Sequence, residues 1–156
     1  MDERPTPGQY AQRLRASCDR LVAFVVGCPE DAWRAAPLAP GDPRPVGVIA
    51  DHVADAYGYL GGWVQELLAG GSPTVSGELV DGLNARHAAA AAGVTRHAAA
   101  HHLEERGDAL AGLIGGVRAD DMELGEGRLR RLVEIAIRHT DDHHGELVAA
   151  VSQSGA

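Results

Sequence analysis

Two histidines four residues apart, His139 and His143, are the pair in this sequence best placed to bind one metal ion. Each residue of an α-helix turns by about 100°, so these side chains lie about 40° apart on one face, whereas His144 points about 140° away from His139. The apolar residues of the same segment form one stripe that includes both histidines; they are Leu129, Leu132, Ala136, Leu147 and Ala150. His139 and His143 should therefore face the core, where imidazole nitrogens need a metal ion or a polar partner.

His52 is a third histidine expected to face the core. It lies near the start of a predicted helix whose apolar side carries Ile49, Val53, Ala56, Leu60, Trp63, Val64 and Leu67. Helical bundles build metal sites from inward-facing side chains of packed helices, so three histidines on two helices could converge on one ion. The alternative is that each is an ordinary core histidine with a polar neighbour.

The remaining histidines are expected to have no role in such a site. His97 and His101 share the four-residue spacing, but they project on the side opposite the apolar stripe of their helix and should be solvated. We expect no functional role for His87 or His102 either. Arg106 lies nearer the apolar side than a solvated arginine should, so it could bind an anionic substrate or cofactor, or a buried carboxylate. A side chain that buries its stem and extends its charge into solvent is the alternative.

The elements that must position these residues are predicted to be helices. The chain has 156 residues, of which 45% are hydrophobic and only 4% aromatic, and Ala and Gly are abundant. This length suits one domain over 1–156, and the composition favours closely packed helices over a sheet. We therefore expect an all-α fold. Its four long helices are predicted at about 8–27, 46–69, 96–117 and 129–151.

The connections between these helices are predicted to be short helical turns and loops. A helical turn is expected at 29–33, and the proline-rich segment 37–45 should be an irregular loop. The segment 70–94 could be loop or could contain helical turns. Cys18 and Cys28 fall at opposite ends of one predicted helix, too far apart for a disulfide, so both should be free thiols.

Charge and sequence pattern limit the partners. The formal net charge of −8 argues against nucleic acid and anionic membranes, which attract basic patches, and favours a small-molecule substrate. No secretory signal or apolar run of about 18 residues is present, so we expect a cytoplasmic protein. Ile135, Ile137 and Val148 lie off the main apolar stripe of the last helix, which predicts a homodimer that buries this second surface.

Three short motifs resemble the DinB-like superfamily, also called YfiT-like, of metal-dependent four-helix bundles. They are 46–56 with its early His52, 81–86, and 139–147, and they follow the family's order and spacing over nearly the whole chain. The family includes mycothiol-dependent maleylpyruvate isomerase and bacillithiol S-transferases. The resemblance implies an up-down-down-up four-helix bundle with short extra helices in its connections. It also implies that His52, His139 and His143 bind a divalent metal, usually zinc or nickel.

Glu146 and His144 depart from the family pattern, in which glutamine and arginine are common at these positions. Glu146 lies about 20° from His139 in the helical projection. Its carboxylate could accept a hydrogen bond from a ligand imidazole, act as a fourth ligand or serve as a general base. Asp55, three residues after His52, could also orient a ligand imidazole; an ordinary surface carboxylate is the alternative.

The chemistry of such a site fits several functions. Three neutral imidazoles leave coordination positions open, and a divalent ion then activates bound water or a bound thiol. The resemblance implies a thiol-dependent S-transferase or isomerase that uses a low-molecular-weight thiol such as mycothiol. A metal-dependent hydrolase of a small substrate and a non-catalytic, stress-associated binding bundle are the alternatives. A closed site with Glu146 as fourth ligand would favour the binding bundle, and an open site facing a pocket would favour an enzyme.

Overall fold

The computed structural model describes residues 3–35 and 42–154, which form helices, turns and loops with no strand among them. The four long helices are α1 (Pro7–Gly27), α3 (Val46–Leu68), α5 (Arg96–Gly115) and α6 (Leu124–Ser154). The shorter elements are α2 (Glu30–Arg34), α4 (Gly77–Ala90) and the 3₁₀-helix η1 (Asp120–Glu123). The expected all-α fold is confirmed, and the arrangement is compatible with a four-helix bundle that carries extra helices in its connections.

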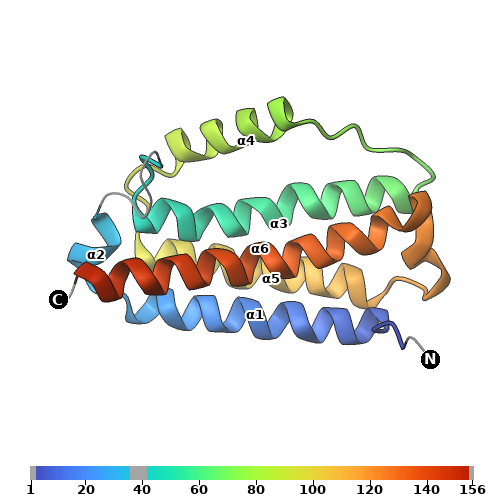
Figure 1. Cartoon of the computed structure of the whole chain (residues 1–156), viewed down its shortest axis with the longest axis horizontal. Coiled ribbons are helices and arrows are strands. Elements are labelled where there is room, and N and C mark those ends of the chain that lie inside the picture. Colours follow the sequence, from blue (N-terminus) through green and yellow to red (C-terminus); the bar gives the residue numbers. More distant parts are fainter. Residues whose placement is uncertain (1–2, 36–41, 155–156) are drawn as a thin grey trace.

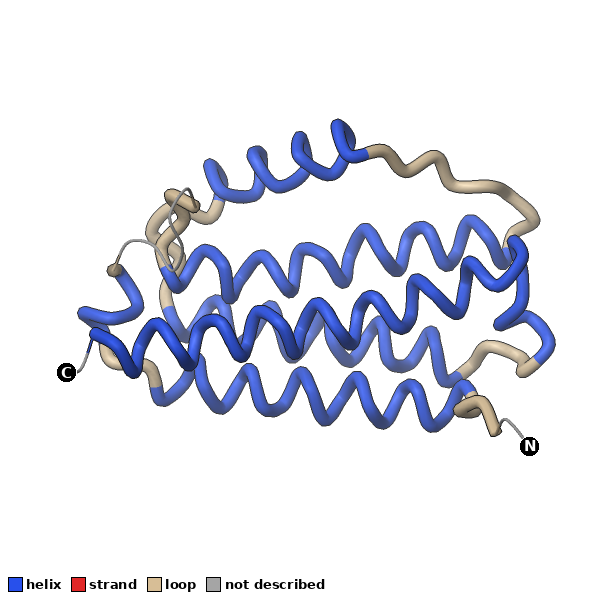
Figure 2. The backbone as a smooth tube through the Cα atoms, viewed as in Figure 1, coloured by secondary structure: helices blue, strands red, loops and turns tan. Residues whose placement is uncertain are grey.

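The four long helices pack side by side around one hydrophobic core (Figure 1). Followed from blue to red, α1 and α6 run in one direction, and α3 and α5 run in the opposite direction. Figure 2 shows α4 outside this group, along α3 and joined to the rest by a loop at each end. None of the α4 residues is buried. The core is therefore built by the four long helices with Trp33 of α2 and Met122 of η1, and α4 lies against its outside.

Side-chain caps define where three of the helices begin. The Thr6 hydroxyl accepts the backbone N–H of Gln9, while the Gln9 side chain accepts the backbone N–H of Thr6, which forms a capping box at α1. Ser76 caps α4 and Thr95 caps α5, each through a single bond from its hydroxyl oxygen to a backbone N–H. These caps satisfy N–H groups that have no partner inside the helix.

The start of α6 is a turn rather than regular helix. Gly125, Glu126 and Gly127 all have positive φ angles, of 64°, 58° and 79°. Glycine adopts this left-handed conformation readily, whereas a residue with a Cβ does so rarely. The regular part of the helix therefore begins at Arg128, close to the predicted start.

A close contact between α2 and α3 depends on glycine. A Cβ at Gly47 would lie 2.5 Å from the ring of Trp33, so only glycine fits against this ring. Trp33 is buried, and its indole N–H donates to the backbone oxygen of Val94 at 2.8 Å. The turn expected at 29–33 is thus a short helix that is fixed to the start of α3.

The connections differ from the sequence expectation mainly at α4. This 14-residue helix occupies most of the segment for which the sequence allows either loop or helical turns. Residues 37–41 of the expected proline-rich loop lie outside the described residues. None of the described helices is both long and apolar enough to cross a membrane.

The two cysteines are free and buried, as expected. Burial raises the pKa of the Cys18 thiol to about 11, and burial also raises the pKa of Cys28. The Cys18 sulfur donates to the backbone oxygen of Leu103 at 3.3 Å. Because a thiol with a raised pKa carries little thiolate at neutral pH, both side chains serve packing rather than nucleophilic chemistry.

Candidate metal centre

Three histidines from two helices meet between α3 and α6. His52 comes from α3, and His139 and His143 come from α6. One potential ligand atom of each lies within 4.8 Å of the other two, so these side chains can hold one metal ion. The Nε2 atoms of His52 and His139 are 3.1 Å apart, and the ring centroids of His139 and His143 are 4.4 Å apart.

A buried hydrogen bond next to the histidines fixes α3 against α6. The hydroxyl groups of Tyr57 and Thr140 are 2.7 Å apart, and Thr140 also donates to the backbone oxygen of Ala136 at 2.8 Å. Thr140 directly follows His139, and Tyr57 lies about one and a half helical turns after His52. This bond holds the two histidine-bearing backbones at a defined separation.

The environment keeps two of the three histidines uncharged. Burial lowers the pKa of His52 to about 3, with a smaller contribution from repulsion by His139 and His143. Burial likewise lowers the pKa of His139 to about 4, helped by repulsion from His143. A neutral imidazole offers a lone pair to a metal ion, whereas a protonated one cannot. The site is therefore ready to bind a cation at neutral pH.

The Nδ1 atoms of His52 and His143 differ in their hydrogen bonding. Nδ1 of His52 is buried and has no hydrogen-bond partner among the described residues. Nδ1 of His143 lies 3.0 Å from the Oε2 of Glu146. A carboxylate that accepts this N–H leaves Nε2 as the free ligand atom and fixes the orientation of the ring. The structure thus brings Glu146 to His143, whereas the helical projection places it near His139.

His144 lies away from the three histidines, as its helical position predicts. Its ring packs against Phe24 of α1, with the centroids 5.9 Å apart. His97 and His101 are exposed, as expected for the outer face of α5. The four-residue spacing of these last two histidines therefore has no bearing on the candidate metal centre.

A cavity of about 460 Å³ lies beside the candidate metal centre, and His52 and His139 form part of its wall. Residues of α3, α4 and α6 and of the loop before α4 complete the wall. Most of them are apolar or aromatic. One polar exception is Asn84 of α4, whose side-chain oxygen is buried without a partner among the described residues. A small molecule can therefore reach the histidines from one side.

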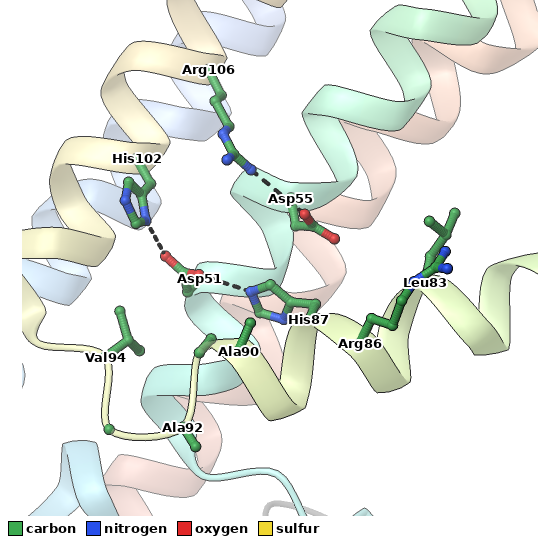
Figure 3. Close-up of a pocket in the computed structure, with 12 residues that line it drawn as sticks. Asp51, Asp55, Leu83, Arg86, His87, Ala90, Ala92, Val94, His102 and Arg106 are labelled. Carbon is green, nitrogen blue, oxygen red and sulfur yellow. Dashed lines mark hydrogen bonds and ion pairs between the residues drawn. The ribbon is translucent and has the colours of Figure 1, made fainter.

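Asp51, His87 and His102 form a second cluster that the sequence did not predict (Figure 3). One Asp51 carboxylate oxygen lies 2.8 Å from Nε2 of His87, and the other lies 2.8 Å from Nδ1 of His102. Burial raises the pKa of the Asp51 carboxyl, but the two histidine hydrogen bonds outweigh this effect and hold the pKa below its usual value. The carboxylate thus joins α4 and α5 to α3.

His87 and His102 are not among the three clustered histidines, in agreement with the expectation that they are not ligands. They have a structural contact that the sequence did not predict, because they connect three helices through one buried carboxylate. Asp51 precedes them by 36 and 51 residues, so no local pattern links the three. In the sequence, the signal that could have suggested a partner for these histidines is the acidic residue Asp51 next to His52.

Arg106 and Asp55 also lie away from the candidate metal centre. They pair with each other at 3.6 Å and line a second cavity of about 540 Å³, together with Asp51, His87 and His102 (Figure 3). Arg106 therefore pairs with a half-buried carboxylate rather than a buried one, and its side chain is 45% exposed. Asp55 does not orient a ligand imidazole, because its carboxylate faces Arg106.

These features define a candidate three-histidine metal centre that opens onto a small-molecule cavity. Neutral imidazole nitrogens suit zinc, nickel and other borderline divalent ions. Comparisons of this chain with protein-family models, with characterised proteins and with solved structures gave no match.

Proposed function

We propose that this protein is a divalent-metal-dependent enzyme in which His52, His139 and His143 hold the ion, zinc or nickel. One observation carries the proposal: three potential ligand atoms gather within 4.8 Å beside a cavity that a small molecule can enter. The lowered pKa values of His52 and His139 support it, because both rings are neutral at pH 7. The Nε2 atoms of His52 and His139 lie 3.1 Å apart, close to the separation of two nitrogen ligands that each bind one zinc ion at about 2.0–2.1 Å.

The chain's own residues would prepare the site for reaction. Glu146 accepts the Nδ1–H of His143 and so orients that ring. The apolar wall of the cavity excludes water from a bound substrate and strengthens electrostatic interactions there. A divalent ion bound by the three histidines supplies Lewis-acid chemistry, which makes a thiol or a water nucleophilic at neutral pH.

We infer that the reaction is a thiol-dependent S-transfer or isomerisation with a low-molecular-weight thiol of the mycothiol type. The support is the resemblance of 46–56, 81–86 and 139–147 to DinB-like proteins. In Figure 1, α1 and α6 run in one direction, and α3 and α5 run in the opposite direction. This order of directions supports the up-down-down-up bundle that the resemblance implies. Both buried cysteines have raised pKa values, so the thiol would come from a cofactor rather than from the chain.

The decisive experiment is elemental analysis of protein purified without a histidine tag and without chelator. About one zinc or nickel ion per chain is expected in the parent. The ion should be lost in His52→Ala, His139→Ala and His143→Ala and kept in His97→Ala, whose side chain is exposed. A metal-free parent that also fails to bind added zinc or nickel would overturn the proposal and leave a non-catalytic binding bundle.

Activity assays on the metal-loaded protein then test the reaction. We expect the parent to transfer a low-molecular-weight thiol of the mycothiol type to chlorodinitrobenzene. His139→Ala should abolish this transfer. If nitrophenyl esters are hydrolysed instead and no thiol is transferred, the enzyme is a hydrolase and the thiol assignment is wrong.

A further inference from the structure

The cavity beside the three histidines has a positive lining in an acidic protein. The chain carries 22 acidic and 14 basic residues, with a formal net charge of −8. Nevertheless, the charged side chains of the cavity wall are Arg128 and Arg131, and the described lining residues include no aspartate or glutamate. A cavity lined by one sign of charge with apolar walls concentrates the electric field and attracts ligands of the opposite sign.

These two arginines are free to bind a ligand. Eight arginines of the chain form an ion pair with a described carboxylate, but Arg128 and Arg131 do not. The Arg128 side chain makes no hydrogen bond with the described residues either. A guanidinium group carries five N–H donors, which match the geometry of a carboxylate or phosphate. No described carboxylate lines the cavity, and the nearby Glu123 forms ion pairs with Arg4 and Arg130 rather than with Arg131, so both guanidinium groups can contact one anion.

The turn at the start of α6 holds Arg131 at this position. Nη1 of Arg131 donates to the backbone oxygen of Glu126 at 2.9 Å. Glu126 is the non-glycine residue with positive φ, and a Cβ at Gly127 would lie 3.3 Å from the same Nη1. The left-handed turn thus gives the guanidinium room and one anchoring bond, and leaves its other donors available.

The remainder of the cavity suits an apolar molecule. Tyr59 and Trp63 lie next to each other on the wall, with their ring centroids 5.1 Å apart, and Leu60 and Ile135 are further apolar lining residues. Aromatic side chains bury large apolar areas against a ligand. Along α6, Arg131 precedes His139 by eight residues, which corresponds to roughly 12 Å. The charged end and the histidine end of the cavity are thus separated by an apolar stretch.

We propose that this cavity binds an elongated ligand with an apolar body and one anionic group, and that Arg128 and Arg131 bind the anionic group at the end remote from the histidines. This inference rests on the proposed function, because it assigns a substrate class to the same site. The ligand would place its reacting group at the three histidines, at least roughly 12 Å from its carboxylate or phosphate, because the Arg131 side chain reaches back toward Glu126.

The test is calorimetric titration of the full-length, zinc-loaded protein with decanoate and with decanol, which have similar chains and differ in charge. Decanoate should bind about tenfold more tightly, because charge-assisted hydrogen bonds are stronger than neutral ones. The difference should disappear in the double variant Arg128→Gln/Arg131→Gln. It should persist in Arg118→Gln, which replaces an exposed arginine outside the cavity. Thermal unfolding monitored by circular dichroism verifies that each variant is folded.

Equal affinities for the two probes, binding of neither, or a decanoate preference that survives the double substitution would each overturn the assignment. The same titrations on metal-free protein separate this assignment from the proposed function. A parent that binds no metal but prefers decanoate through the two arginines refutes the metal enzyme and supports the anion site. A parent that binds metal but does not prefer decanoate supports the metal enzyme and refutes the anion site.

Discussion

Glu146 is the residue whose effect on the candidate metal centre is most directly testable. Its carboxylate accepts a hydrogen bond from Nδ1 of His143 at 3.0 Å, and its side chain is 56% exposed. Loss of a carboxylate that orients a ligand histidine lowers metal affinity by roughly tenfold to a hundredfold. Because Glu146 is partly exposed, we expect Glu146→Ala to lower metal affinity by about tenfold, the smaller of these effects. Competition with a chromogenic zinc chelator measures the change. Asp142→Ala, an exposed neighbour on α6, should leave the affinity unchanged, and an equal effect of both variants would contradict the role of Glu146.

The lowered pKa values of His52 and His139 predict how stability depends on pH in the metal-free protein. Both rings stay neutral when folded down to about pH 4, whereas in the unfolded chain they take up protons near the ordinary histidine pKa of 6.5. The unfolded state thus binds more protons between these values, so stability falls as pH decreases from about 6.5 to 4. A pKa lowered from 6.5 to about 4 corresponds to ~3 kcal/mol for His139 alone.

Urea unfolding of the metal-free protein at a series of pH values measures this dependence. A His139→Leu variant should show a shallower decline over the same range, because one titrating ring has been removed. A free energy of unfolding that is constant from pH 6.5 to 4 would mean that the folded histidines take up protons as easily as the unfolded ones.

Local helix geometry accounts for the part of the site that the sequence could predict. The spacing of His139 and His143 fixes their common face, and the apolar stripe of the second long helix places His52 inward. The pairing of Glu146 with His143 rather than His139 depends on side-chain rotamers, which the projection does not contain. The hydrogen bond between His87 and Asp51 depends on where a separate helix lies, so spacing could not predict it.

At the scale of elements, a polar contact between His87 and Asp51 joins α4 to α3. No residue of α4 is fully buried when backbone and side chain are counted together. The side chain of His87, however, is only 7% exposed where it contacts Asp51. Replacing His87 by Ala removes a hydrogen bond to a carboxylate, which stabilises by about 1.5–3 kcal/mol. Amide hydrogen exchange in α4 should become at least roughly tenfold faster, while α1 and α5 are unaffected.

The matched control for this prediction is His101→Ala. His101 is a histidine of α5 whose side chain is 68% exposed, so its loss should not change exchange in α4. Exchange measured by mass spectrometry on peptides covering 77–90 distinguishes the variants. If His87→Ala leaves α4 fully protected, the helix is held by its apolar contacts and the Asp51 bond is incidental.

Two glycines of α3 give opposite predictions for the same substitution. Gly47→Ala should lower the free energy of unfolding by about 1–3 kcal/mol, because the added methyl group would overlap the buried Trp33 ring. Gly62→Ala should raise it by about 0.5–1 kcal/mol, because nothing lies within 4 Å and alanine favours helix. Chemical denaturation measures both. A stabilised Gly47→Ala protein would show that Trp33 moves freely.

The long helices were predictable because each buries a continuous apolar stripe. Their bounds agree with the expected ranges to within a few residues, since the regular part of α6 begins at Arg128. The helix α4 could not be delimited in the same way. Its residues include no buried position and therefore carry no clear stripe to distinguish helix from loop. Its N-cap, Ser76, is the local signal that marks its start.

At the scale of the whole molecule, the all-α fold followed from composition, whereas the number of subunits stays a prediction. Ile135 and Val148 are 37% and 43% exposed on α6, but Ile137 packs partly against the core and leaves the expected dimer surface smaller. We still expect a homodimer that covers Val148, whereas Ile135 lines the cavity beside the histidines. Light scattering at micromolar concentration checks this, and a monomer mass would refute it.

The placement of the two tryptophans has a spectroscopic consequence. Trp33 is 3% exposed and packs on Gly47, whereas Trp63 lines the histidine cavity sixteen residues further along α3, roughly 24 Å away. Fluorescence from Trp63 should change when a molecule enters the cavity, whereas Trp33 is not one of the residues that line it. A Trp33→Phe variant would therefore carry a single built-in optical sensor of occupancy, which needs no added dye.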